Sequence, residues 1–270
     1  MIKFFRKIRQ NLITEGKTVN PALPAGRYLK YAIGEILLVV IGILIALQVN
    51  TWNEHRKARI VEKNFFEDVL QDLQKDQDRL EYYELFHAKR KEYLDTLLTY
   101  VRNPQKEMGI NKFQQYVEPL YYSPSPTSYS TAFESAKATG IFNDIEAKDL
   151  IKELSQYYSD FAQIEDICTS ITRYVEDKFE PIMYNFPEGK INKETGNLVI
   201  NEENVQDFYD KIAAIKDNRN IDIDYQLILR TPRMENYLIG DMGRTFNAIG
   251  KIKSRQERLK ELMQKIMNRD

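Results

Sequence analysis

The chain has 270 residues, of which 43% are hydrophobic and 29% are charged, so it carries enough apolar side chain for a folded core. With 11 glycines and 9 prolines, the composition favours helices over a loop-rich β fold. The 39 basic and 40 acidic residues nearly cancel, which excludes a global nucleic-acid footprint. One cysteine excludes an internal disulfide framework, and two histidines leave little material for a zinc site or a histidine-based triad.

An apolar segment at residues 32–49 reads AIGEILLVVIGILIALQV, and its only charged residue is Glu35. As a helix, a segment of this length covers ~27 Å, close to the ~30 Å hydrocarbon core of a bilayer. Aromatic residues suited to the two membrane interfaces flank it: Tyr28, Tyr31 and Trp52. We predict one transmembrane helix over residues 31–52, the alternative being the core helix of a soluble protein.

The charge distribution predicts how the chain is oriented in the membrane. Residues 1–30 carry seven basic groups and one acidic group, Glu15, whereas the chain that follows is acidic overall. The apolar segment is longer than that of a signal peptide, and no small-residue cleavage site follows it, so we expect an uncleaved anchor. The positive-inside rule then makes residues 1–30 a basic cytoplasmic tail and residues 53–270 a periplasmic α-helical domain.

One face of the predicted membrane helix carries Glu35, Gly42 and Ala46. Gly42 and Ala46 form a pair of small residues that permits close approach of another helix. In that interpretation Glu35 either bonds across the contact or carries a proton. The alternative is that Glu35 reaches the interface alone, or pairs with Arg27 or Lys30.

Apolar residues recur at helical spacing through the predicted outer domain, which indicates long helices packed side by side in a coiled-coil-like bundle. Over residues 56–102 they are Phe66, Val69, Leu73, Leu80, Tyr83, Leu94, Leu97 and Val101. Asp76, His87 and Arg90 occupy stripe positions too, either as a hydrogen-bonded layer or as a pH-sensitive site. Prolines near residues 104 and 121–127 predict a helix end and then a loop.

Capping patterns and a second stripe predict further helices. Thr131 with Glu134, and Asn143 with Glu146, have capping-box spacing, and Gly140 is suited to a helix C-terminus. The second stripe ends near Pro181 and comprises Leu150, Leu154, Tyr157, Phe161, Ile164, Cys168, Ile171 and Val175.

The C-terminal part of the chain contains weaker patterns. Residues 184–200 form a loop or a hairpin, and a short helix is predicted at about 202–216. The last helical stretch follows Asp224, and Pro232 starts, kinks or interrupts it. The apolar positions predicted for it are Ile239, Met242, Phe246, Ile249, Leu259, Met263 and Ile266.

The sequence holds no P-loop, zinc-protease motif or nucleophile elbow. Cys168 lies on an apolar stripe, as a buried hydrophobic residue would. Close helix packing better explains three glycines: Gly240, Gly243 and Gly250. Solvated charge better explains three carboxylates: Glu176, Asp177 and Glu180. We therefore expect no catalytic residue, no cofactor and no metal site.

Two stretches of sequence resemble a family of uncharacterised bacterial membrane proteins, the family of unknown function DUF6090. They are residues 1–57, with MIKFFRKIRQNLITEGK and YLKYAIGEILLVVIGILIALQVNTWNEHRK, and residues 128–158, with STAFESAKATGIFNDIEAKDLIKELSQYY. The resemblance implies a Gram-negative inner-membrane protein with one anchor, and it transfers no catalytic residue. The insertion TVNPALPAGR before Tyr28 looks longer than the family's usual linker.

The sequence thus predicts a mainly α protein with one N-terminal transmembrane helix followed by an extracytoplasmic helical bundle. We expect a non-catalytic scaffold or accessory subunit of a cell-envelope assembly in the bacterial inner membrane. Its expected partners are the lipid bilayer and a protein, or a second copy, bound through the membrane helix, with no nucleic acid. The alternatives are a periplasmic ligand sensor signalling through a partner, and a proton-coupled stator-like subunit that uses Glu35.

Overall fold

A computed structural model describes residues 24–103, 105–183, 204–214 and 225–269, and in these residues the fold is helical with no β-strand. The longest helix, α2, runs without a break from Pro24 to Arg102. The chain forms two compact units, divided after Arg59, so α2 contributes residues to both. The interpretation of residues 184–200 as a loop or a hairpin lies outside the described residues.

The first unit contains the apolar part of α2. An 18-residue window of this helix has a mean hydropathy of 2.6, and none of the window is buried within the chain. Among the described residues, α2 is the one helix that is long and apolar enough to cross a membrane, judged by length and composition. The predicted span therefore falls on a helix whose apolar side chains have no packing partner within the described part of the chain.

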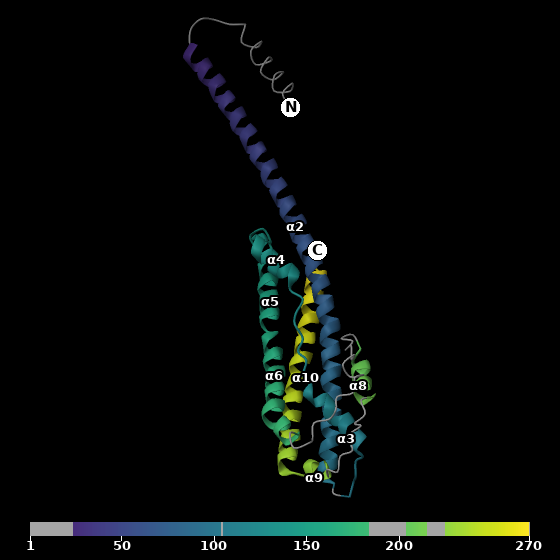
Figure 1. Cartoon of the computed structure of the whole chain (residues 1–270). Helices are drawn as coiled ribbons and strands as arrows, with labels where there is room; N and C mark the ends of the chain where they lie inside the picture. Colours follow the sequence, from purple (N-terminus) through teal and green to yellow (C-terminus); the bar gives the residue numbers. More distant parts are fainter. Residues whose placement is uncertain (1–23, 104, 184–203, 215–224, 270) are drawn as a thin grey trace. The chain divides into compact units, whose positions relative to one another are not determined.

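The second unit, residues 60–270, is a bundle in which α10 (Pro232–Met267) lies alongside α5 (Lys148–Ser159), α6 (Ala162–Tyr174) and the second half of α2 (Figure 1). The shorter helices are α3 (Ile110–Val117), α4 (Thr131–Thr139), α7 (Glu180–Met183), α8 (Val205–Ala214) and α9 (Tyr225–Leu229). Single turns of helix complete the described elements: η2 (Glu118–Tyr121), η3 (Ile141–Asn143) and the π-helical η4 (Val175–Phe179).

The two predicted stripes form the core of this bundle. On α2 the stripe is buried except for Tyr83 and Val101, which are half-buried, and the three polar positions Asp76, His87 and Arg90 are fully buried with it. The second stripe is buried from Leu154 onward. Helical periodicity therefore predicted these faces correctly. The coiled-coil-like character of the helices stays a prediction.

The predicted capping boxes are not formed. No side chain of its own segment caps α4, and α5 begins at Lys148 rather than after Asn143. Instead, buried carboxylates of α2 accept hydrogen bonds from the backbone at both helix starts. Asp72 accepts from Ala132 at 2.9 Å, and Glu62 accepts from the N–H groups that precede α5. Gly140 ends α4 with a φ of 77°, as predicted.

The helix that carries the second stripe ends near Pro181, as predicted: it continues through the π-helical turn η4 into α7, which ends at Met183. On α10, Ile239 and Phe246 are exposed by 46% and 53%, so the predicted stripe has the wrong phase at this point. Pro232 is the first residue of α10, where its missing N–H costs nothing.

Candidate functional site

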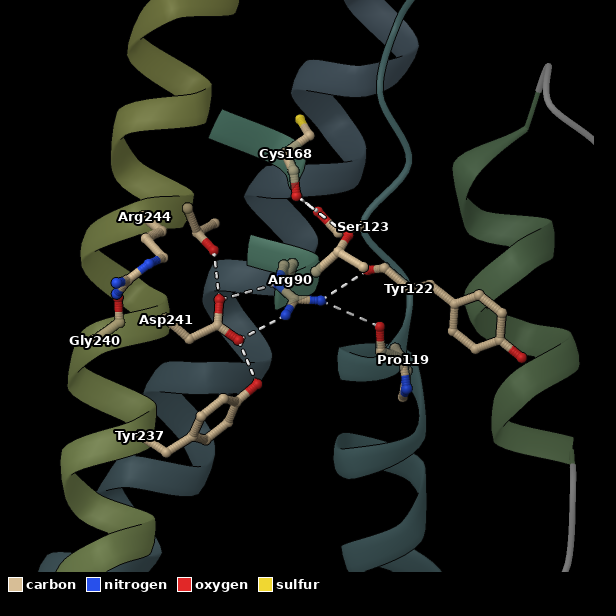
Figure 2. Close-up of polar contacts among 11 residues, drawn as sticks. Arg90, Pro119, Tyr122, Ser123, Cys168, Tyr237, Gly240, Asp241 and Arg244 are labelled. Carbon is tan, nitrogen blue, oxygen red and sulfur yellow. Dashed lines mark hydrogen bonds and ion pairs between the residues drawn. The ribbon is translucent and has the colours of Figure 1, made fainter. Parts of the chain in front are cut away.

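A buried ion pair joins α2 to α10 in the middle of the bundle. Arg90 and Asp241 are both inaccessible to solvent, and the guanidinium donates two parallel hydrogen bonds to the carboxylate, at 2.6 and 3.3 Å (Figure 2). The third guanidinium nitrogen donates to the main-chain oxygens of Tyr122, at 2.8 Å, and Pro119, at 3.4 Å. Each nitrogen of Arg90 therefore has an acceptor.

Asp241 is also fully engaged. Its carboxylate accepts hydrogen bonds from the hydroxyls of Tyr237, at 2.5 Å, and Thr245, at 3.2 Å, both on the same helix (Figure 2). Burial is the largest single effect and would lower the pKa of Arg90, but the charge and hydrogen bonds of Asp241, together with Tyr237 and Tyr209, outweigh it and raise that pKa above its ordinary value. The cluster links α2, η2 and α10 to one another, and its polar groups are all engaged in these hydrogen bonds.

Next to the ion pair, Cys168 of α6 faces His87 of α2, with Sγ 3.6 Å from Nε2. Burial, together with the charge of Arg90, lowers the pKa of His87 to about 4. Burial raises the pKa of the Cys168 thiol to about 11. Both side chains are therefore neutral near pH 7. A thiolate–imidazolium pair suited to nucleophilic catalysis does not form, in keeping with Cys168 as a buried hydrophobic residue.

The remaining chemical candidates from the sequence do not converge on a site. Glu176, Asp177 and Glu180 are exposed at the π-helical turn, as solvated charges would be. Of the three glycines on α10, only Gly240 packs closely: a Cβ there would overlap the side chain of Tyr174. At Gly243 and Gly250 a Cβ would meet open space, so close packing does not explain these two.

In the apolar segment, the side chains of Glu35 and Trp52 are exposed, and a Cβ at Gly42 would meet nothing in the described chain. The guanidinium of Arg56 lies over the Trp52 ring at 5.9 Å, which places a cation beside the aromatic ring at the end of the predicted span. The interfacial roles predicted for Tyr28 and Tyr31 concern side chains outside the described ones. The predicted contact through Glu35, Gly42 and Ala46 stays a prediction.

Sequence reasoning missed Asp241, Thr245 and Tyr237. It treated α10 as an apolar stripe and therefore passed over its buried polar positions. A signal was present in the i, i+4 spacing of these three residues, which places their polar groups on one face. The partner on α2, Arg90, was correctly assigned to a polar layer.

These observations define an all-helical protein, in its described residues, with one helix apolar enough to span a membrane. Residues 35–163 match the model of a family of unknown function, DUF6090, which confirms the resemblance predicted from the sequence. No curated protein and no solved structure matches the chain. The matched region includes Arg90 and residues 35–49 of the apolar segment but ends before α10, so it does not include Asp241.

Proposed function

We propose that this chain is a single-pass inner-membrane protein whose N-terminus is cytoplasmic and whose bundle is periplasmic. The observation that carries the proposal is the 18-residue apolar window of α2, none of which is buried within the chain. A long run of exposed apolar side chains is costly in water, and a bilayer would cover it. The basic residues before the window support the orientation.

The proposed role is that of a non-catalytic scaffold or accessory subunit of a cell-envelope assembly. Two fully buried charged groups, Arg90 and Asp241, bond to one another, and Arg90 also bonds to the protein backbone rather than facing an open pocket. The thiol and the imidazole beside them are neutral near pH 7. Such groups favour structural specificity over chemistry, and the expected partner is a protein or a second copy bound through the membrane helix.

A reporter enzyme that is active only in the periplasm, fused after Asp270, tests the orientation. We expect activity from this fusion and none from a reporter that requires the cytoplasm. The opposite pattern would overturn the proposed compartment.

Purification of the chain in mild detergent, followed by mass spectrometry, tests the subunit role. A stable protein partner in stoichiometric amount supports it, whereas a co-purified small molecule without a partner favours the ligand sensor. Glu35→Gln keeps a hydrogen-bonding group and removes the proton-carrying one. We expect assembly and cellular function to survive this change; loss of function with intact assembly would instead support the stator-like alternative.

A further inference from the structure

We name residues 122–132 the strap; they comprise the connection from η2 to α4 and the first two residues of α4, and they run antiparallel to α2. Without a neighbouring strand, the strap bonds its backbone to side chains of α2. In chain order, Arg90 donates to the Tyr122 oxygen, Arg79 to the Thr127 oxygen, Asp76 accepts from Tyr129 N–H, and Asp72 from Ala132 N–H. One helix therefore holds the strap at intervals along its length.

Asp76 is the unusual member of this series because it is a fully buried carboxyl group that is not paired with a cation. It is fully buried and accepts hydrogen bonds from the Tyr129 backbone, at 2.6 Å, and from the Tyr157 hydroxyl, at 3.1 Å. Arg79, one turn away, donates instead to Thr127 and to the Tyr129 hydroxyl. Among the described residues, no cation lies within ion-pair distance of Asp76. A buried, unpaired carboxylate favours its neutral, protonated form.

The groups around Asp76 come from three elements besides the strap. On α2, Asp72 adds a like charge and Arg79 an opposite one. On α5, Tyr157 is bonded to Asp76, and the buried hydroxyl of Tyr158 has no hydrogen-bond partner. On α10, Arg255 lies over the Tyr157 ring at 5.6 Å. Burial outweighs the hydrogen bonds and the Arg79 charge, and raises the pKa of Asp76 to about 7.

We propose that Asp76 makes the Thr127–Tyr129 part of the strap a pH-dependent latch, closed when the carboxyl group is protonated and loosened when it is ionised. Opening would admit water to Asp76 and return its pKa toward the ordinary 3.8. The closed latch therefore binds more protons than the open one between pH 3.8 and about 7, and opening becomes more frequent as the pH rises through this range.

His87 lies near Pro124 of the strap, and its titration would give strap opening the opposite pH dependence. Its low pKa reflects burial and Arg90, partly offset by the Pro124 carbonyl and Asp241. Release of the whole strap would expose both groups, and their pH dependences would partly cancel. The contribution of Asp76 must therefore be measured as a difference between matched proteins.

Amide hydrogen exchange at Tyr129, in the full chain in detergent, measures opening of the latch. After correction for intrinsic exchange rates, we expect the opening constant of the wild type, relative to Asp76→Asn, to rise roughly 50-fold from about pH 5 to pH 7. The asparagine keeps an acceptor for the Tyr129 N–H but does not titrate. An identical pH dependence in the two proteins would overturn the proposal.

Two further variants test whether Asp76 itself, rather than net charge, controls the pH dependence. Asp78→Asn removes the same charge from an exposed position on α2, and we expect it to follow the wild type. Tyr157→Phe removes a bond that lowers the pKa of Asp76, so the transition should move to higher pH. A transition that Tyr157→Phe leaves in place, or that Asp78→Asn abolishes, would show that Asp76 is not the controlling group.

Discussion

At the scale of single residues, removing one partner of the buried Arg90–Asp241 pair should be costly, because the other partner stays buried without its counter-charge. Arg90→Met would leave the Asp241 carboxylate buried without its cation, which costs about 3–5 kcal/mol in comparable ion pairs. We expect a loss of this size in the free energy of unfolding, measured by urea denaturation in detergent. Arg102→Met is the control, since it breaks an exposed pair with Glu235 between the same two helices, at 2.7 Å, and should cost less than about 1 kcal/mol. Equal losses would show that burial does not decide the effect.

Gly240 is required for close packing, whereas Gly250 on the same helix is not. The Tyr174 ring lies against Gly240, stacked between Tyr237 and the guanidinium of Arg244, which is 3.8 Å from the ring centre. Gly240→Ala forces this stack apart and should destabilise the fold by about 1–3 kcal/mol. Gly250→Ala meets open space and should stabilise the helix by up to about 1 kcal/mol. Thermal unfolding would measure both, and shifts of the same sign would contradict the packing argument.

His87 couples folding to pH in the opposite sense to Asp76. Its pKa is about 4 in the folded chain and ordinarily 6.5, so between these values the unfolded chain binds the extra proton. The stability contributed by His87 is thus present above pH 6.5 and is lost as the pH falls toward 4. Relative to His87→Gln, the wild-type free energy of unfolding should fall by up to about 1.4 kcal/mol per pH unit in this window. A difference that is constant with pH would rule this out; Asp76 is common to both proteins and cancels.

At the scale of elements, α2 supplies the caps that the shorter helices lack. Asp72→Ala removes the acceptor of the Ala132 N–H at the start of α4, and should cost about 1 kcal/mol in unfolding free energy. Thr131→Ala changes the residue that the sequence marked as the cap, yet no side chain of that segment caps α4, so the cost should be near zero. Denaturation measures both costs. If Thr131→Ala costs more unfolding free energy than Asp72→Ala, the capping-box prediction would be supported instead.

The sequence predicted elements well where one residue type repeats on one face. The α2 stripe and the stripe from Leu154 to Val175 needed only helical periodicity, and both are buried. Capping failed because Asp72 lies 60 residues from the amide that it binds, a separation that no local pattern contains. On α10 the phase failed because the buried face includes Asp241, which an apolar pattern counts as exposed. The sequence therefore predicted the α2 members of the polar layer but not Asp241, the partner of Arg90 on α10.

At the scale of the whole molecule, the two units present different surfaces. The bundle has an apolar core, formed by clusters of buried residues from α2, the shorter helices and α10. The apolar window of α2 buries none of its residues within the chain. A surface of this kind needs an outside partner, and lipid alone is sufficient for an anchor. Whether a protein shares that surface depends on the small residues within it.

Replacing Gly42 by Leu tests whether another helix packs on the anchor. Gly42 and Ala46 lie one turn apart, and inside lipid the attraction between helices comes mainly from close van der Waals packing. A leucine at Gly42 keeps the segment apolar, and its Cβ meets nothing in the described chain, so folding should be unaffected. We expect it to weaken cross-linking of the chain to itself or to its partner in native membranes by several-fold. Val40→Leu, roughly on another face, should leave cross-linking at the wild-type level. If the two variants behave alike, the helix is an anchor only, and assembly must depend on the bundle.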